Sequence, residues 1–132
     1  MSLSIALSLL AAAAASTGID CDKSPYWSKG QDCTAVKLAG AEKELAAVWN
    51  QALTYAAVID KNNSDDYDSK EPGQTAKAYL VASERAWIAY RNTTCHLDYF
   101  KDPGTLSRVV EGECMLAMTR LRIKGLKSFM EL

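Results

Sequence analysis

The segment 33-CTAVKLAGAEKELAAVWNQALTYAAVI-59 decides the fold class, because its apolar residues recur every three or four positions. With about 3.6 residues per turn, that spacing aligns them along one side of an α-helix. Asp32 stands directly before the segment, where an N-cap residue is expected, and Gly40 is the one poor helix former inside it. The inward stripe predicted for this helix is Leu38, Ala41, Leu45, Val48, Trp49, Ala52, Ala56 and Ile59.

Two more helices are predicted downstream. The second spans about residues 75 to 99 and ends before the turn at Pro103-Gly104, and the third spans about residues 106 to 130, with Thr105 or Ser107 as its cap. The residues expected to point inward are Leu80, Trp87, Tyr90, Thr94 and Leu97 on the second helix and Val110, Cys114, Ala117, Leu121 and Phe129 on the third.

The lengths of these helices predict how they pack. Helices of about 25 residues are roughly 35 to 40 Å long, and they bury their apolar stripes only by lying side by side. The chain shows no alternating run long enough for a strand. We therefore predict an all-α fold, an antiparallel three-helix bundle.

The N-terminal run MSLSIALSLLAAAAAS is apolar, uncharged and rich in alanine, which is typical of a signal peptide cleaved near residues 15 to 17. It contains no Lys or Arg, so an alanine-rich first helix is the alternative. The run is too short to span a membrane, which takes about 20 apolar residues. We predict a signal peptide over residues 1–17, a single helical domain over residues 18–132, and a periplasmic or secreted location.

The four cysteines, Cys21, Cys33, Cys95 and Cys114, are expected to form two disulfides in an exported chain. Three pairings are possible. Local pairing of Cys21 with Cys33 and of Cys95 with Cys114 is favoured because it closes two short loops, each stabilising by roughly 3 kcal/mol. The segment 21–32 would then lie over one end of the bundle.

Composition and charge exclude some functions. The 132 residues are 48% apolar and 23% charged, which is ordinary for one globular domain. The formal net charge of −1 provides no broad basic field, so a nucleic-acid partner is not expected. The single histidine, His96, is too few for a two-histidine zinc site, and no G-x-S-x-G motif announces a nucleophile. We predict no enzymatic activity and no cofactor.

The stretch 60-DKNNSDDYDSKE-71 has the ligand spacing of an EF-hand calcium loop. Asp65 stands where the sharp turn calls for Gly, however, and Pro72-Gly73 follows where the exiting helix should begin. We interpret the stretch as a solvated loop between helices and keep a calcium-binding module as the alternative. Its ligands would be Asp60, Asn62, Ser64, Asp66, Asp68 and Glu71.

The most specific signal is 83-SERAWIAYRNTTC-95 followed by 114-CMLAMTRLRIKGL-126. Trp87 and Arg91 are one helical turn apart, so the guanidinium can lie against the indole, and Arg122 can project into the same seam. An arginine among apolar faces must be paired, and the expected partners are Glu42 and Glu44. We interpret the set as a structural network that fixes helix register; an exposed anion or partner site is the alternative.

The same residues carry a family resemblance. The pattern R-A-W-I-A-Y-R-x3-C, from Arg85 to Cys95, resembles that of the lysozyme inhibitor LprI-like N-terminal domains, a family of secreted bacterial domains. The pattern C-x4-T-x2-R-x3-L, with Thr119 and Arg122, is similar to the last helix of that family, and Cys21-x11-Cys33 has its spacing. The resemblance covers about residues 20 to 127.

The chain also departs from the family pattern A-D-x-E-L-N-x-x-Y on the first helix. Glu42 stands in place of the Asp, Ala46 in place of the Asn and Trp49 in place of the Tyr. Around the first motif, Glu84 replaces the usual Gln and Asn92 the usual Asp. If the missing Asn contacts a partner, the family's activity does not simply follow from the fold; if it only bonds within the bundle, the fold survives.

The resemblance implies a helical, disulfide-bonded envelope or secreted domain with the lysozyme-inhibiting activity of the family's namesake. Inhibition would act by occlusion of the lysozyme active site, and the acidic 65-to-71 loop would steer association with a basic lysozyme. A structural envelope protein with another partner is the remaining alternative.

Overall fold

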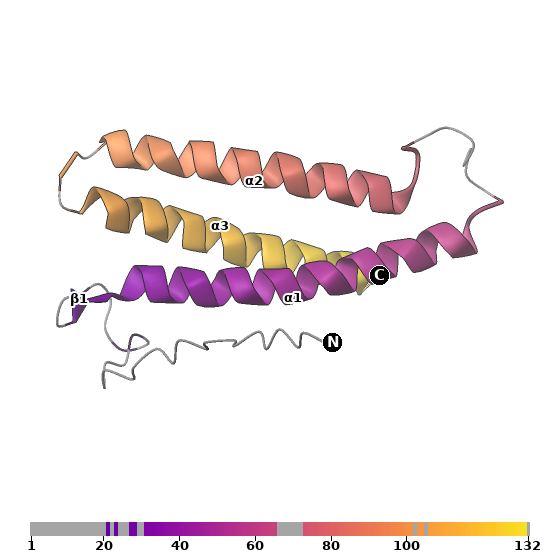
Figure 1. The fold of residues 1–132 in the computed structure, drawn as a ribbon, viewed down its shortest axis with the longest axis horizontal. Helices are drawn as coiled ribbons and strands as arrows, with labels where there is room; N and C mark the ends of the chain where they lie inside the picture. The colour runs from indigo at the N-terminus through magenta and orange to yellow at the C-terminus, as the bar shows by residue number, and fades with distance from the viewer. Residues whose placement is uncertain are drawn as a thin grey trace, which may run out of the picture.

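The computed structural model describes residues 21, 23, 27–28, 31–65, 73–101, 103–104 and 106–131. Three long helices dominate it: α1 (Cys33–Asn62), α2 (Ala76–Lys101) and α3 (Ser107–Met130). The predicted all-α three-helix bundle is confirmed (Figure 1). The predicted signal peptide, residues 1–17, lies outside the described residues.

Two very short strands precede α1. β1 (Trp27–Ser28) pairs antiparallel with β2 (Gln31–Asp32), with Trp27 opposite Asp32. The sequence analysis did not predict them, because two residues are too few to show an alternating pattern. Asp32, the predicted cap, is the last residue of β2 and directly precedes α1.

The three helices lie side by side, with α2 antiparallel to both α1 and α3 (Figure 1). Consequently α1 and α3 run in the same direction. Near the start of both helices, a Cβ added at Gly112 would meet Thr34 Cγ2 at 3.0 Å, so the missing side chain lets α3 approach α1 closely. Near the end of α3, Lys127 bonds to Glu44.

The predicted inward stripe of α1 is confirmed at its centre. Ala41, Leu45, Val48, Ala52 and Ala56 are buried, and the remaining three predicted residues are partly buried. This stripe forms the main core with one residue of α2 and two of α3. The buried members of that core are Leu45, Val48, Ala52, Ala56, Leu80, Ile123 and Leu126.

The inward faces predicted for α2 and α3 are wrong in part. Tyr90 and Leu97 on α2 are 62% and 68% exposed, and on α3 Ala117 is exposed and Leu121 is 68% exposed. The buried positions of α2 include Glu84 and Arg91 instead. The predicted face of α2 was chosen by its apolar residues, whereas Glu84 and Arg91 are buried in ion pairs with residues of the other helices. On α3 the buried residues are Ser107, Val109, Leu116, Thr119, Ile123 and Leu126.

The predicted cap of α3 is also wrong. Ser107 is the first residue of the helix, and its Oγ donates to the Gly104 carbonyl at 2.7 Å, whereas Leu106 occupies the N-cap position without a side-chain bond. The other candidate cap, Thr105, lies outside the described residues.

Both favoured disulfides are present. Cys21 is bonded to Cys33 with 5.2 Å between the Cα atoms, and Cys95 to Cys114 with 5.5 Å. The first joins the segment before the strands to the start of α1. The second joins the C-terminal part of α2 to the N-terminal part of α3, on either side of the turn that connects them.

Candidate functional site

A charged seam, defined here as Glu42, Glu84, Trp87, Arg91, Thr119 and Arg122, runs between the three helices. At its centre Arg91 Nη1 donates to Glu42 Oε1 at 3.1 Å and to Thr119 Oγ1 at 3.0 Å. Arg91 Nε donates to Asn92 Oδ1 at 3.1 Å. Since the Arg91 side chain is only 9% exposed, these three acceptors replace the water that its charge would otherwise need.

The second arginine of the seam is paired on α2. Arg122 Nε lies 2.8 Å from Glu84 Oε2, and Arg122 Nη2 donates to Ser83 Oγ at 3.1 Å. The Trp87 ring contacts both guanidinium groups, with Arg91 Cζ 5.0 Å and Arg122 Cζ 5.9 Å from its centroid. The indole therefore adds a cation–π contact to each ion pair.

The structure brings five of the six predicted network residues into this seam. The sixth, Glu44, lies apart on the α1–α3 side, where it accepts from Lys127 Nζ at 3.0 Å. The sequence reasoning missed Glu84, although Glu84 and Arg91 are seven residues apart and so share one face of α2. Among the described residues, no buried side-chain nitrogen or oxygen lacks a hydrogen-bond partner. The arrangement favours the structural interpretation of the seam.

One residue of the calcium hypothesis, Asp60, is engaged in bonds within the fold. Asp60 accepts hydrogen bonds from two backbone amides at the start of α2: Ala76 N donates to Oδ1 at 2.7 Å and Lys77 N to Oδ2 at 3.0 Å. Asn62 ends α1 and Ser64 lies in the following turn. The other three candidates, Asp66, Asp68 and Glu71, lie outside the described residues.

Within the part of the chain that the structure describes, no group of three or more His, Cys, Asp or Glu side chains is arranged to hold a metal ion. His96 is 52% exposed and lies against other side chains of the surface: it stacks on Tyr99, and its Nδ1 is 3.3 Å from Glu111 Oε1.

The outer face of α3 is a second candidate site, defined here as Ala117, Arg120, Leu121, Lys124 and Gly125, all exposed. On its α2 side, exposed Tyr90 and Leu121 flank a hollow of about 270 Å³. The residues that line this apolar hollow are Trp87, Tyr90, Met118, Leu121, Arg122 and Gly125.

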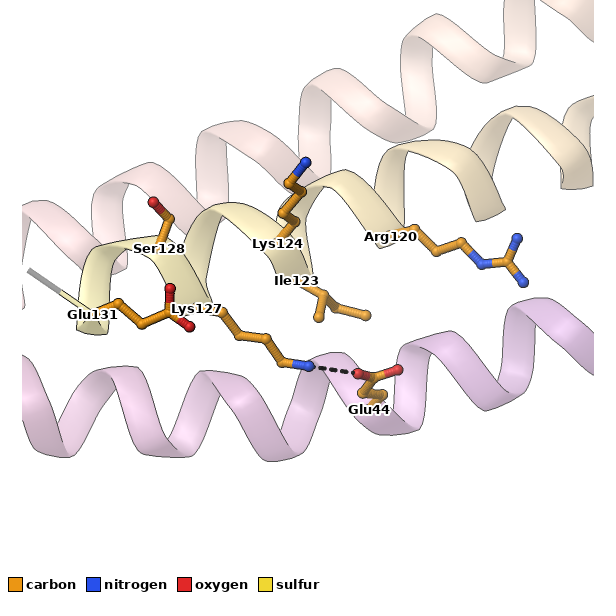
Figure 2. A pocket seen from close by; sticks show the side chains of 7 residues that line it. All are labelled: Glu44, Arg120, Ile123, Lys124, Lys127, Ser128 and Glu131. Atoms are coloured by element: carbon orange, nitrogen blue, oxygen red, sulfur yellow. Dashed lines mark hydrogen bonds and ion pairs between the residues drawn. The ribbon is translucent and has the colours of Figure 1, made fainter.

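On its α1 side, the outer face borders a polar hollow of about 460 Å³. Figure 2 shows Lys127 paired with Glu44 across this hollow, with no ion pair drawn from Arg120 or Lys124. No carboxylate among the described residues pairs with those two cations. The residues that line the polar hollow are Glu44, Arg120, Ile123, Lys124, Lys127, Ser128 and Glu131.

The fold and the seam together define a small, disulfide-bonded helical domain. The family model for the lysozyme inhibitor LprI matches residues 21–126, and the chain belongs to this family, as its motifs predict. The chain is also similar to an uncharacterized protein of Rhizobium meliloti (strain 1021), with 29% identity over 113 residues, 85% of this chain and 79% of that protein. No solved structure matches.

Family membership and the disulfides suggest an extracytoplasmic location, and membership in an inhibitor family suggests a non-enzymatic role. Among the described residues, none of the helices combines the length and the apolar character that crossing a membrane takes.

Proposed function

We propose that this domain is a periplasmic or secreted binding protein without enzymatic activity, which inhibits a lysozyme by covering its active site. The observation that carries the proposal is the match to the lysozyme inhibitor LprI family over residues 21–126. The two disulfides are consistent with function in an oxidising compartment outside the cytoplasm.

The apolar hollow beside the outer face of α3 supports a protein partner. Tyr90 and Leu121 are large, apolar and more than half exposed, and they border a concave site with Trp87, Met118 and Arg122. Tyr, Trp, Met and Arg are the residue types enriched at the centres of protein–protein interfaces. The charges of the seam are bonded internally, so the seam contributes to this contact surface only through Trp87 and Arg122, which line the hollow.

The acidic charge of the stretch after α1 also supports association with a lysozyme. The acidic stretch that starts at Asp65 follows the end of α1, and its sequence carries Asp66, Asp68 and Glu71 as well. Such a cluster attracts a basic lysozyme over a distance of about one Debye length, roughly 8 Å at physiological salt, and raises the association rate more than the affinity.

The proposal is tested by a cell-wall lysis assay with the purified mature protein and a panel of lysozymes. We expect at least one lysozyme to be slowed at micromolar inhibitor. The variants Tyr90→Ser and Leu121→Ser should weaken inhibition without lowering the melting temperature, because both side chains are exposed.

The matched control is Tyr79→Ser, since Tyr79 is a tyrosine of α2 that is 61% exposed and does not line the apolar hollow. Failure to slow any lysozyme would contradict the proposal. In that case a pull-down of envelope proteins on the immobilised domain would identify the partner of a structural envelope protein instead.

A further inference from the structure

Arg120 and Lys124 are two exposed cations on the outer face of α3 without an ion pair to the described residues. They are four residues apart, so they share one side of the helix with a rise of about 6 Å between them. Lys127 extends Arg120 and Lys124 into a row of cations, but the charge of Lys127 is paired with Glu44 at 3.0 Å. The row therefore presents two available positive charges, on side chains that start one helical turn apart.

The other residues that line the polar hollow do not cancel the positive charge of Arg120 and Lys124. Ile123 is buried beneath the row and supplies an apolar base, and the two carboxylates of the lining are Glu44, which is paired with Lys127, and Glu131, at the end of α3. With three cations and two carboxylates, the lining carries a net charge of +1 although the whole chain carries −1. An anionic group approaching Arg120 and Lys124 thus meets an attractive surface.

The chemistry of the two cations points to a class of ligand. An arginine binds a carboxylate through two parallel hydrogen bonds, and a lysine supplies a compact point charge. Arg120 and Lys124 start one helical turn apart and point in different directions from the helix (Figure 2), so each can bind a carboxylate of its own. Lysozymes hold two carboxyl groups in one cleft, because retaining glycosidases cleave their substrate with such a pair.

We propose that Arg120 and Lys124 bind the two catalytic carboxylates of the target lysozyme, one cation to each. This inference rests on the proposed function and names the residues that carry it. Leu121 lies on the same outer face, on its α2 side, so the apolar hollow that Leu121 borders and the cationic row lie next to each other on one contact surface. Inhibition then comes from the loss of both catalytic groups rather than from coverage of the cleft alone.

The first test compares the intact protein with the double variant Arg120→Gln/Lys124→Gln in the lysis assay. Both positions are exposed, and Gln is a good helix former, so the melting temperature should not change. We expect the inhibitor concentration for half-inhibition to rise at least tenfold.

The matched control is Lys77→Gln/Arg85→Gln. These are two exposed cations of α2 that line a separate hollow, and their loss changes the net charge equally. We expect this control to inhibit as the wild type does. Equal weakening of inhibition in both double variants would show a general charge effect and overturn the inference. Undiminished inhibition by the Arg120→Gln/Lys124→Gln variant would also overturn the inference, but it would leave the proposed function intact. A wild-type protein that inhibits no lysozyme would end both proposals.

A second test measures binding instead of lysis. Calorimetry would use an inactive lysozyme in which both catalytic carboxylates are changed to amides. We expect the wild-type protein to bind this lysozyme about as weakly as the double variant binds the unmodified one, with no further loss when the two changes are combined. Additive losses would show that the cations and the carboxylates do not touch, and would overturn the inference.

Discussion

Arg91 on α2 and Glu42 on α1 form an ion pair, 3.1 Å from Nη1 to Oε1, although 49 positions separate them in the sequence. The two partners differ in their surroundings: the Arg91 side chain is 9% exposed and the Glu42 side chain is 45% exposed. Removing the buried partner and removing the half-exposed partner should therefore have unequal effects.

Arg91→Ala should lower the free energy of unfolding by about 2 to 4 kcal/mol, because it leaves a cavity against Trp87 and takes away the hydrogen bond to Thr119. Glu42→Gln should cost only about 1 kcal/mol, since the amide oxygen still accepts from Arg91 and the site is half solvated. Urea denaturation followed by circular dichroism measures both values. Equal costs would contradict the structural role assigned to Arg91.

Glu84 provides a second comparison within the seam, because it bonds to Arg122 at 2.8 Å and its side chain is 11% exposed. Glu84→Ala should destabilise the bundle by about 2 to 3 kcal/mol, since Arg122 would stay partly buried without a carboxylate. Glu84→Gln, which introduces the residue typical of the family, keeps an acceptor and should cost about 1 kcal/mol. A larger loss for Gln than for Ala would refute the pairing in solution.

Asp60 holds the first turn of α2 from the end of α1, through hydrogen bonds to the Ala76 and Lys77 amides. Asp60→Ala should lower the free energy of unfolding by about 1 to 2 kcal/mol, and Asp60→Asn by less. With both carboxylate oxygens engaged, we expect millimolar calcium to leave the melting temperature unchanged. A calcium-dependent rise in the wild type that Asp60→Ala abolishes would restore the calcium-binding hypothesis.

Gly112 and Gly40 form a matched pair of helical glycines. Ala stabilises an exposed helix interior by about 1 kcal/mol relative to Gly, and a Cβ at Gly40 meets nothing within 4 Å, so Gly40→Ala should raise stability by up to that amount. A Cβ at Gly112 meets Thr34 Cγ2 at 3.0 Å, so Gly112→Ala should lose this gain and destabilise by about 1 kcal/mol. Thermal unfolding of both variants checks the difference. Stabilisation by Gly112→Ala would show that α1 and α3 separate easily at this point.

The sequence predicted α1 well and the faces of α2 and α3 less well, for a physical reason. The buried side of α1 is apolar, so spacing reveals it. The buried side of α2 contains Glu84 and Arg91, whose burial depends on partners that α1 and α3 supply. Periodicity treats such residues as exposed and turns Tyr90 and Leu97 inward, which the structure contradicts. Long-range pairing is not visible in hydropathy alone.

The candidate site shows the same limit. The Trp and Arg spacing indicated that Trp87, Arg91 and Arg122 could meet, and they do. That Arg120 and Lys124 form no ion pair with the described residues could not be predicted, because this depends on which carboxylates α1 brings near α3, and Glu44 reaches Lys127 instead.

The disulfide between Cys95 and Cys114 has a mechanical consequence. Under tension between the two ends of the chain, the residues between these cysteines cannot extend while the bond is intact, so α2 and α3 stay joined as one unit at that end. No disulfide in the described part of the chain ties α1 to that unit, because the other bridge closes within the segment that ends at Cys33. A pulling force can therefore separate α1 from α2 and α3 without breaking this bond, and the ion pairs of Glu42 and Glu44 resist that separation.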